Sequence, residues 1–140
     1  MTQSPCLKIL VTGCMCAMPL LLNAAEVRYF QNVGISGLLS ERTVTDCCTN
    51  GKEEKITIPV LELRNAIDVL PLNTLKPAAD EMPELGVKTI QLALDDDSWK
   101  TYKLNKKKDA RVLCSLFHGF NGHHHTAVLC TVKSLQIVKE

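Results

Sequence analysis

Four histidines lie in one short stretch near the C-terminus, FHGFNGHHHTAV, which also contains an Asn-Gly turn signal. Imidazole binds transition metals and exchanges protons near neutral pH, so this stretch could form a metal site or an acid–base cluster. In a hairpin whose loop is Asn121-Gly122 alone, side-chain alternation places three imidazoles on one face: His118, His123 and His125. That register would favour a metal site.

A three-residue loop, 120–122, is the alternative, with glycine in the left-handed position of a bulge. This register disperses the histidines and collects the apolar residues of both strands on one face. Because a buried face specifies register strongly, we favour the three-residue loop. We therefore expect an exposed hairpin tip, no catalytic residue, no metal and no other cofactor. The residues expected on the buried face include Val112, Cys114, Leu116, Val128, Cys130 and Val132.

Aromatic and basic residues gather after the acidic run 95–97. A cationic surface with aromatic side chains at its edge could bind an anionic partner such as a glycan, a phospholipid or a nucleic acid. The alternative is a solvated connection, because charge runs are ordinary in loops. The predicted binding residues are Trp99, Tyr102, Lys103, Lys106, Lys107, Lys108 and Arg111.

The N-terminal segment predicts export. Lys8 precedes an apolar run that ends at the small residues Ala24 and Ala25, as in a secretory signal peptide. The run is too short for a transmembrane span. The sequence VTGC resembles a lipoprotein cleavage box at Cys14, but the apolar stretch before it is too short. We expect a signal peptide over 1–25 and a secreted, extracellular protein.

The cysteine count agrees with removal of this segment. Three of the seven cysteines lie within it, which leaves the even set Cys47, Cys48, Cys114 and Cys130. We expect all four to form disulfide bonds. A bond between adjacent residues would be strained, so Cys47 and Cys48 are each expected to pair with the C-terminal region. The hairpin register places Cys47 toward the core and Cys48 outward.

The mature chain, 26–140, is long enough for one domain. Without Lys8 it carries 15 basic and 15 acidic residues, so it has no global field that would attract nucleic acid. The low aromatic content also argues against a surface for base stacking. A nucleic-acid partner is therefore not expected. The oligomeric state does not follow from the sequence.

Strand signals dominate this domain. The stretch 26–39 is rich in aromatic and β-branched residues, and hairpins are expected over 42–58, 87–104 and 110–138. The first of these turns at Asn50-Gly51. One short helix is expected near residues 60–70, where apolar residues recur at helical spacing between two prolines. The fold class is therefore mainly β, a small disulfide-stabilised sandwich or open barrel built from hairpins.

Two classes of function follow. The favoured class is a secreted binding protein that acts by surface complementarity on another macromolecule, either a protein or an anionic partner. The alternative is a small secreted hydrolase or nuclease that uses His118 or His124 as acid or base, assisted by lysines. We expect binding rather than catalysis. In size, apolar N-terminus and paired cysteines the chain is similar to small secreted effectors, toxins and ligands.

Overall fold

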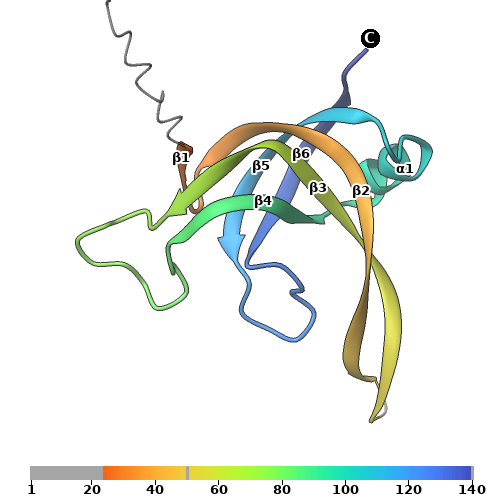
Figure 1. The fold of residues 1–140 in the computed structure, drawn as a ribbon, viewed down its shortest axis with the longest axis horizontal. Helices are drawn as coiled ribbons and strands as arrows, with labels where there is room; N and C mark the ends of the chain where they lie inside the picture. Colours follow the sequence, from red (N-terminus) through yellow and green to blue (C-terminus); the bar gives the residue numbers. More distant parts are fainter. Residues whose placement is uncertain (1–23, 50, 140) are drawn as a thin grey trace, which may run out of the picture.

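A computed structural model describes the backbone of residues 24–49 and 51–139, and the side chains of all of these except 47–49. The predicted signal peptide lies outside the described residues. The described chain forms six strands and one helix (Figure 1). In chain order they are β1 (Ala25–Arg28), β2 (Asn32–Thr49), β3 (Lys52–Leu70), β4 (Glu84–Ala93), α1 (Asp96–Leu104), β5 (Asp109–His118) and β6 (Val128–Ile137).

Five of the strands close into a barrel. Strand β3 pairs antiparallel with β2 and β4, and β5 pairs antiparallel with β2 and β6. A parallel pairing between β4 and β6 completes the ring, and β1 adds to β3 as a short parallel strand. The expected mainly β fold is confirmed, and the hairpin-built sheet curls into a barrel.

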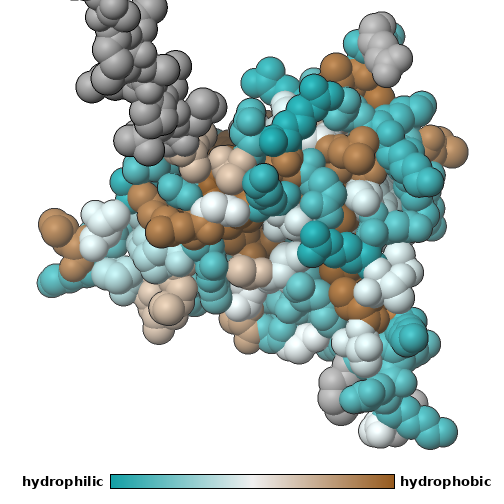
Figure 2. All heavy atoms as spheres, viewed as in Figure 1, coloured by the Kyte–Doolittle hydropathy of each residue, from teal (hydrophilic) through white to brown (hydrophobic). Residues whose placement is uncertain are grey.

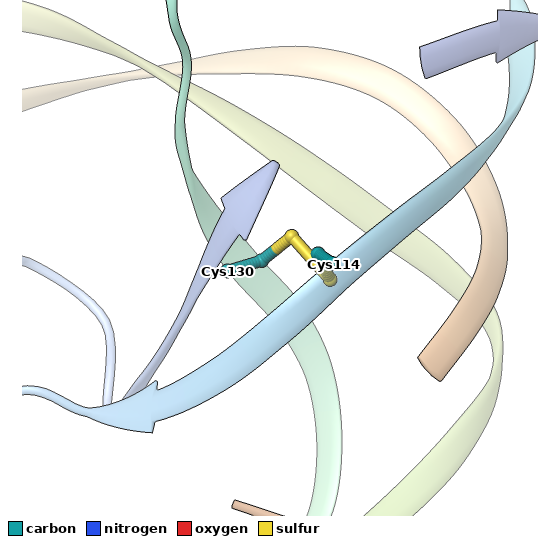
Figure 3. The surroundings of a disulfide bond; sticks show 2 residues. All are labelled: Cys114 and Cys130. Carbon is teal, nitrogen blue, oxygen red and sulfur yellow. A yellow bond between two sulfur atoms is a disulfide. The ribbon is translucent and has the colours of Figure 1, made fainter. Parts of the chain in front are cut away.

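The barrel interior holds one apolar cluster and a disulfide bond. Cys114 and Cys130 are fully buried and bonded to each other, with their Cα atoms 5.6 Å apart (Figure 3). The ladder explains the bond, because Cys114 pairs with Val132 and Leu116 pairs with Cys130, so both cysteines point inward two residues apart. The buried face predicted for β5 and β6 is therefore confirmed.

The expected cysteine partners are wrong for this pair. Cys114 and Cys130 bond to each other and not to Cys47 and Cys48, because they point inward from adjacent strands with Cα atoms 5.6 Å apart, a distance that suits a disulfide. The side chains of Cys47 and Cys48 lie outside the described residues, so their predicted oxidation and burial stay predictions.

The helix expected near residues 60–70 is wrong, because this segment belongs to β3. Its inward residues recur at every second position, at Leu61, Leu63, Ile67 and Val69, with Asn65 exposed between them. Helical spacing arose from combining residues of two strand faces. Pairing with three neighbouring strands, β1, β2 and β4, decides the conformation.

The chain has its helix instead at α1, where the sequence suggested the second arm of a hairpin. Asp95 caps the helix, its side chain accepting a hydrogen bond from the Ser98 N–H at 2.8 Å. Acidic residues occupy the first turn and Lys103 the last, which complements the helix dipole. No helix in the described part of the chain has the length and apolar character needed to cross a membrane.

The β2–β3 hairpin is confirmed, with Thr49 opposite Lys52 and Gly51 in the turn before Lys52. The register shifts between Asp46 and Thr49, so Glu54 pairs with Asp46 rather than with Cys47 as expected. A bulge of this kind adds one residue to one strand and interrupts the alternation on which the predicted orientations of the two cysteines depended. Hydrophilic residues cover this projecting hairpin, at the lower right of Figure 2.

The β5–β6 hairpin has a longer loop than either predicted register. His118 pairs with Val128, so nine residues, 119–127, connect the strands; we call this segment the histidine loop. Nine is an odd number like three, and side-chain alternation depends only on that parity. The predicted faces were therefore right although the predicted three-residue loop was wrong.

Candidate functional site

The predicted binding residues fall into three separate places. Those on α1 contact one another and the β2–β3 ribbon. The Trp99 and Tyr102 rings stack with centroids 5.4 Å apart, Lys103 Nζ lies 5.2 Å from the Trp99 centroid, and Lys106 Nζ lies 2.6 Å from Glu41 Oε2. The Tyr102 hydroxyl donates to the Ser40 carbonyl at 2.8 Å. Burial and the Glu41 carboxylate raise the pKa of Tyr102.

The other predicted residues lie away from this cluster. Lys107 and Lys108 line a hollow at the start of β5, and Arg111 lies on the outer side of β5 against Gly34. Lys103 on α1 and Lys106 just after it each lie against an aromatic ring, and Lys106 also pairs with Glu41, so this cluster secures the helix to the β2–β3 ribbon. The binding role predicted for these residues stays a prediction.

The histidine loop is a folded element. The Gly119 N–H donates to the Ala127 carbonyl at 2.8 Å, which closes the loop at its base. A Cβ atom at Gly119 would lie 2.6 Å from the Thr126 carbonyl oxygen, so this position requires glycine. Near the tip, Asn121 Oδ1 accepts from the His123 N–H at 3.0 Å. The loop therefore presents its imidazoles from a defined backbone.

Gln91 of β4 holds the histidine loop against the barrel wall. Its side chain accepts from the His125 N–H at 2.8 Å and donates to the His123 carbonyl at 3.2 Å. Its own backbone N–H donates to Thr126 Oγ1 at 3.1 Å. The loop is thus docked on β4 through three bonds to one residue.

Asp46 of the β2–β3 hairpin faces two of the imidazoles. Its Oδ2 lies 3.0 Å from His123 Nδ1, and its Oδ1 lies 3.9 Å from His125 Nε2. Asp46 Oδ1 and His125 Nε2 are both buried, and neither has a hydrogen-bond partner within the described part of the chain. Two loops far apart in sequence therefore meet at a carboxylate between two imidazoles.

The predicted exposure of the histidines is confirmed only for His123, whose side chain is 72% exposed. His125 is 12% exposed and His118 is 21% exposed. The longer loop folds back onto the barrel, and a short hairpin tip could not do this. Among the described residues, no group of three or more histidine, cysteine or acidic side chains is arranged to hold a metal ion.

The remaining two histidines have separate surroundings. His118 Nε2 lies 2.9 Å from Glu84 Oε1, a carboxylate partner that the sequence did not indicate. His124 accepts from the Phe120 N–H at 3.1 Å and packs edge-on against Phe117 and Phe120. Burial, followed by the neighbouring His123 and His125, lowers the pKa of His124.

A second polar group lies on the outer side of the barrel and is formed by residues of β2, β3 and β4. Arg42 of β2 bonds Glu62 of β3 at 3.2 Å and Thr89 of β4 at 2.7 Å, and Thr89 donates to Glu62 at 2.7 Å. We call this surface the loop face. It consists of Arg42, Asp46, Glu62, Thr89 and Gln91 on the strands and His123 and His125 on the histidine loop.

Sequence reasoning missed Asp46, Gln91 and Glu84 as partners of the histidines. Each comes from another strand, and no local pattern marks it. The helix cap Asp95 was visible in principle. An acidic N-cap, acidic residues in the first turn and a lysine, Lys103, in the last turn together form a helix signature.

The strand order identifies the class of fold. A five-stranded barrel ordered β2-β3-β4-β6-β5, with a helix between the third and fourth barrel strands, has the topology of OB-fold barrels. Residues 89–136 match a family model described as Domain of unknown function (DUF4431). This segment runs from within β4 through α1 and β5 into β6. No curated protein and no solved structure matches the chain.

Proposed function

We propose that this protein is a secreted binding module that recognises another protein through the loop face. The observation that carries the proposal is the meeting of the β2–β3 hairpin and the histidine loop at Asp46. In OB-fold barrels, ligands bind across the second and third barrel strands between these two loops. The position of the loop face is therefore inferred by analogy with this fold. The chemistry of the loop face supports the same proposal independently.

The chemistry of the loop face suits a polar, hydrogen-bonding partner. It offers imidazoles, an amide, a hydroxyl and carboxylates, and its one cation, Arg42, is paired with Glu62. A nucleic-acid surface needs several free cations. Asp46 Oδ1 and His125 Nε2 are buried without a hydrogen-bond partner among the described residues, and a role in binding would account for such atoms.

Export is part of the proposal. The apolar N-terminal segment and the buried Cys114–Cys130 bond support it, since disulfides persist in oxidising compartments. Mass spectrometry of the protein from its native source should find a mature chain that starts near Ala25 or Glu26. A chain that starts at Met1 or Thr2 would contradict export.

Binding is tested by affinity capture from the native extracellular fluid, with bait variants compared quantitatively. His123→Ala and Arg42→Ala should both lose the same captured protein, because both side chains are on the loop face. The matched control is Arg111→Ala, which removes an exposed arginine from β5. If all three variants retain the partner equally, the loop face is not the binding surface.

Catalysis is the second candidate, and the His118–Glu84 pair is the observation that favours it. A carboxylate that orients an imidazole is a recurring feature of general acid–base sites. Turnover of RNA and of generic esters is the test, with His118→Ala and His124→Ala as variants. Activity that His118→Ala abolishes and His123→Ala spares would favour catalysis over binding.

A further inference from the structure

A hollow lies at the opposite end of the β5–β6 hairpin from the histidine loop. Its volume is about 630 Å³, within the usual size range of small-molecule sites. We call it the basic hollow. It is lined by Arg64, Lys107, Lys108, Asp109, Ile137, Val138 and Lys139.

Positive charge dominates this hollow. It contains four basic side chains and one carboxylate, and that carboxylate, Asp109, is engaged by Arg64 through two hydrogen bonds. Lys108 Nζ donates to the neutral Asn105 side chain at 3.1 Å, which leaves its charge uncompensated. In the described chain, no carboxylate lies within ion-pairing distance of Lys107, Lys108 or Lys139. Among the described residues, three lysine charges in this hollow are therefore without a carboxylate partner.

The backbone that carries two of these lysines is fixed before any ligand arrives. The Lys107 N–H donates to the Leu39 carbonyl at 2.8 Å, and the Leu39 N–H donates to the Lys108 carbonyl at 3.0 Å. Lys107 has φ of 66°, in the left-handed region that favours glycine. A lysine kept at such a position costs stability, and strain of this kind concentrates at functional sites.

The hollow also has an apolar wall. Ile137 and Val138 line it, and Val138 is 51% exposed. A wall of this type beside a group of lysines suits a ligand that carries an anionic group on a carbon skeleton. An inorganic ion could use only the lysines.

We propose that the basic hollow binds a phosphate or sulfate ester, with the anionic group on Lys107, Lys108 and Lys139 and the carbon skeleton on Ile137 and Val138. The arginine–aspartate pair fixes the rim of the site. This surface is separate from the loop face, so the proposal stands or falls independently of the proposed function.

Titration of the isotope-labelled protein with phenyl phosphate, phenyl sulfate, inorganic phosphate and inorganic sulfate tests the site by NMR. Saturable shifts should appear in the amides of residues 107–109 and 137–139, with the esters binding more tightly than the inorganic ions. Affinity should fall as salt is added, because the charges are exposed. Equal affinity for esters and inorganic ions would overturn the role of the apolar wall. Absence of saturation at millimolar ligand would overturn the site.

A variant that keeps the fold makes the test decisive. Lys107→Gly relieves the left-handed backbone while removing a charge, so it should fold at least as well as the wild type. Combined with Lys139→Gln, it should weaken phenyl phosphate binding by at least about tenfold, the effect of losing charge-assisted hydrogen bonds.

The matched control is Lys133→Gln, an exposed lysine on β6 outside the hollow. It should change the affinity by less than about twofold, because distant surface charges are screened. If the control weakens binding as much as the double variant, binding reflects overall charge and the proposed site is wrong.

Discussion

The barrel interior and the loop face treat their polar groups in different ways. Inside, each buried tyrosine hydroxyl has one backbone partner: Tyr29 donates to the Met82 carbonyl at 2.7 Å, and Tyr102 donates to the Ser40 carbonyl at 2.8 Å. On the loop face, polar side chains share partners, and Asp46 lies between two imidazoles with one oxygen that has no hydrogen-bond partner among the described residues. The tyrosine hydroxyls thus have complete hydrogen bonding. The loop face joins two separate hairpins, and its hydrogen bonding is incomplete among the described residues.

This difference bears on stability and on the binding proposed for the loop face. A hydroxyl with one fixed acceptor rigidifies the core at little cost, while an unpartnered buried atom costs free energy without adding contacts. Proteins depart from complete hydrogen bonding chiefly at functional sites. Changes inside the barrel should therefore affect folding, whereas under the proposed function changes on the loop face should affect binding.

The largest effect is expected from the disulfide. Replacing both Cys114 and Cys130 with alanine removes a bond that closes a loop with a sequence separation of 16 residues. The free energy of unfolding should fall by about 3 kcal/mol from loop entropy alone. Urea unfolding followed by circular dichroism measures this change. A loss smaller than that caused by Tyr29→Phe would mean that the disulfide does not stabilise the interior as expected.

A smaller loss is expected from Tyr29→Phe. Removing the hydroxyl deletes one hydrogen bond to a partly exposed carbonyl, which should cost about 1 kcal/mol. Burial, and then Glu84 and Glu81, raise the pKa of Tyr29 to about 12.

Tyr29→Phe should also change how the free energy of unfolding depends on pH in the alkaline range. The folded state holds the Tyr29 proton more tightly than the unfolded state, whose pKa is 10.0, so this stabilisation is complete below pH 10 and is lost as pH rises through about 12. Tyr29→Phe should make the decline in this window shallower. An unchanged decline would contradict the assignment to Tyr29.

The loop face should tolerate change at Asp46. Asp46→Asn should alter the free energy of unfolding by less than about 1 kcal/mol, because it removes a partly unsatisfied contact. Hydrogen exchange at the amides of His125 and Gln91 should become faster, since the two loops lose their contact. A stability loss equal to that of the disulfide variant would show that the loop face belongs to the folding core.

The smallest effect is expected at acid pH from His124. Its pKa is lowered from 6.5 in the folded state, so the unfolded state binds a proton more readily, and stability should fall as pH drops below 6.5 toward the folded pKa. His124→Asn should reduce this decline slightly. The groups that cause the shift besides burial are His123 and His125, so the comparison is made with both intact. An identical pH profile in the variant would exclude His124 as a cause.

Much of the fold was predictable because it follows from local patterns. Alternation identified the buried face of β5 and β6, and Asn50-Gly51 identified the β2–β3 turn. Residues 60–70 of β3 were misassigned because their conformation depends on three partner strands, which no local spacing encodes. The helix α1 was missed because turn and helix-cap signals use the same residues, aspartate and serine.

For the site, the sequence by itself determined which side chains are available: a histidine-rich loop, lysines after α1 and two cysteines of matching parity on neighbouring strands. Only the tertiary structure decided which of them are partners. Barrel closure brings Asp46 to His123 and Glu84 to His118, and it places Lys139 beside Lys107 in the basic hollow. The members of each pair are too far apart in the sequence for any local pattern to relate them. The physical reason is that side-chain direction is set locally by the strand, whereas pairing is set by the closing of the whole sheet.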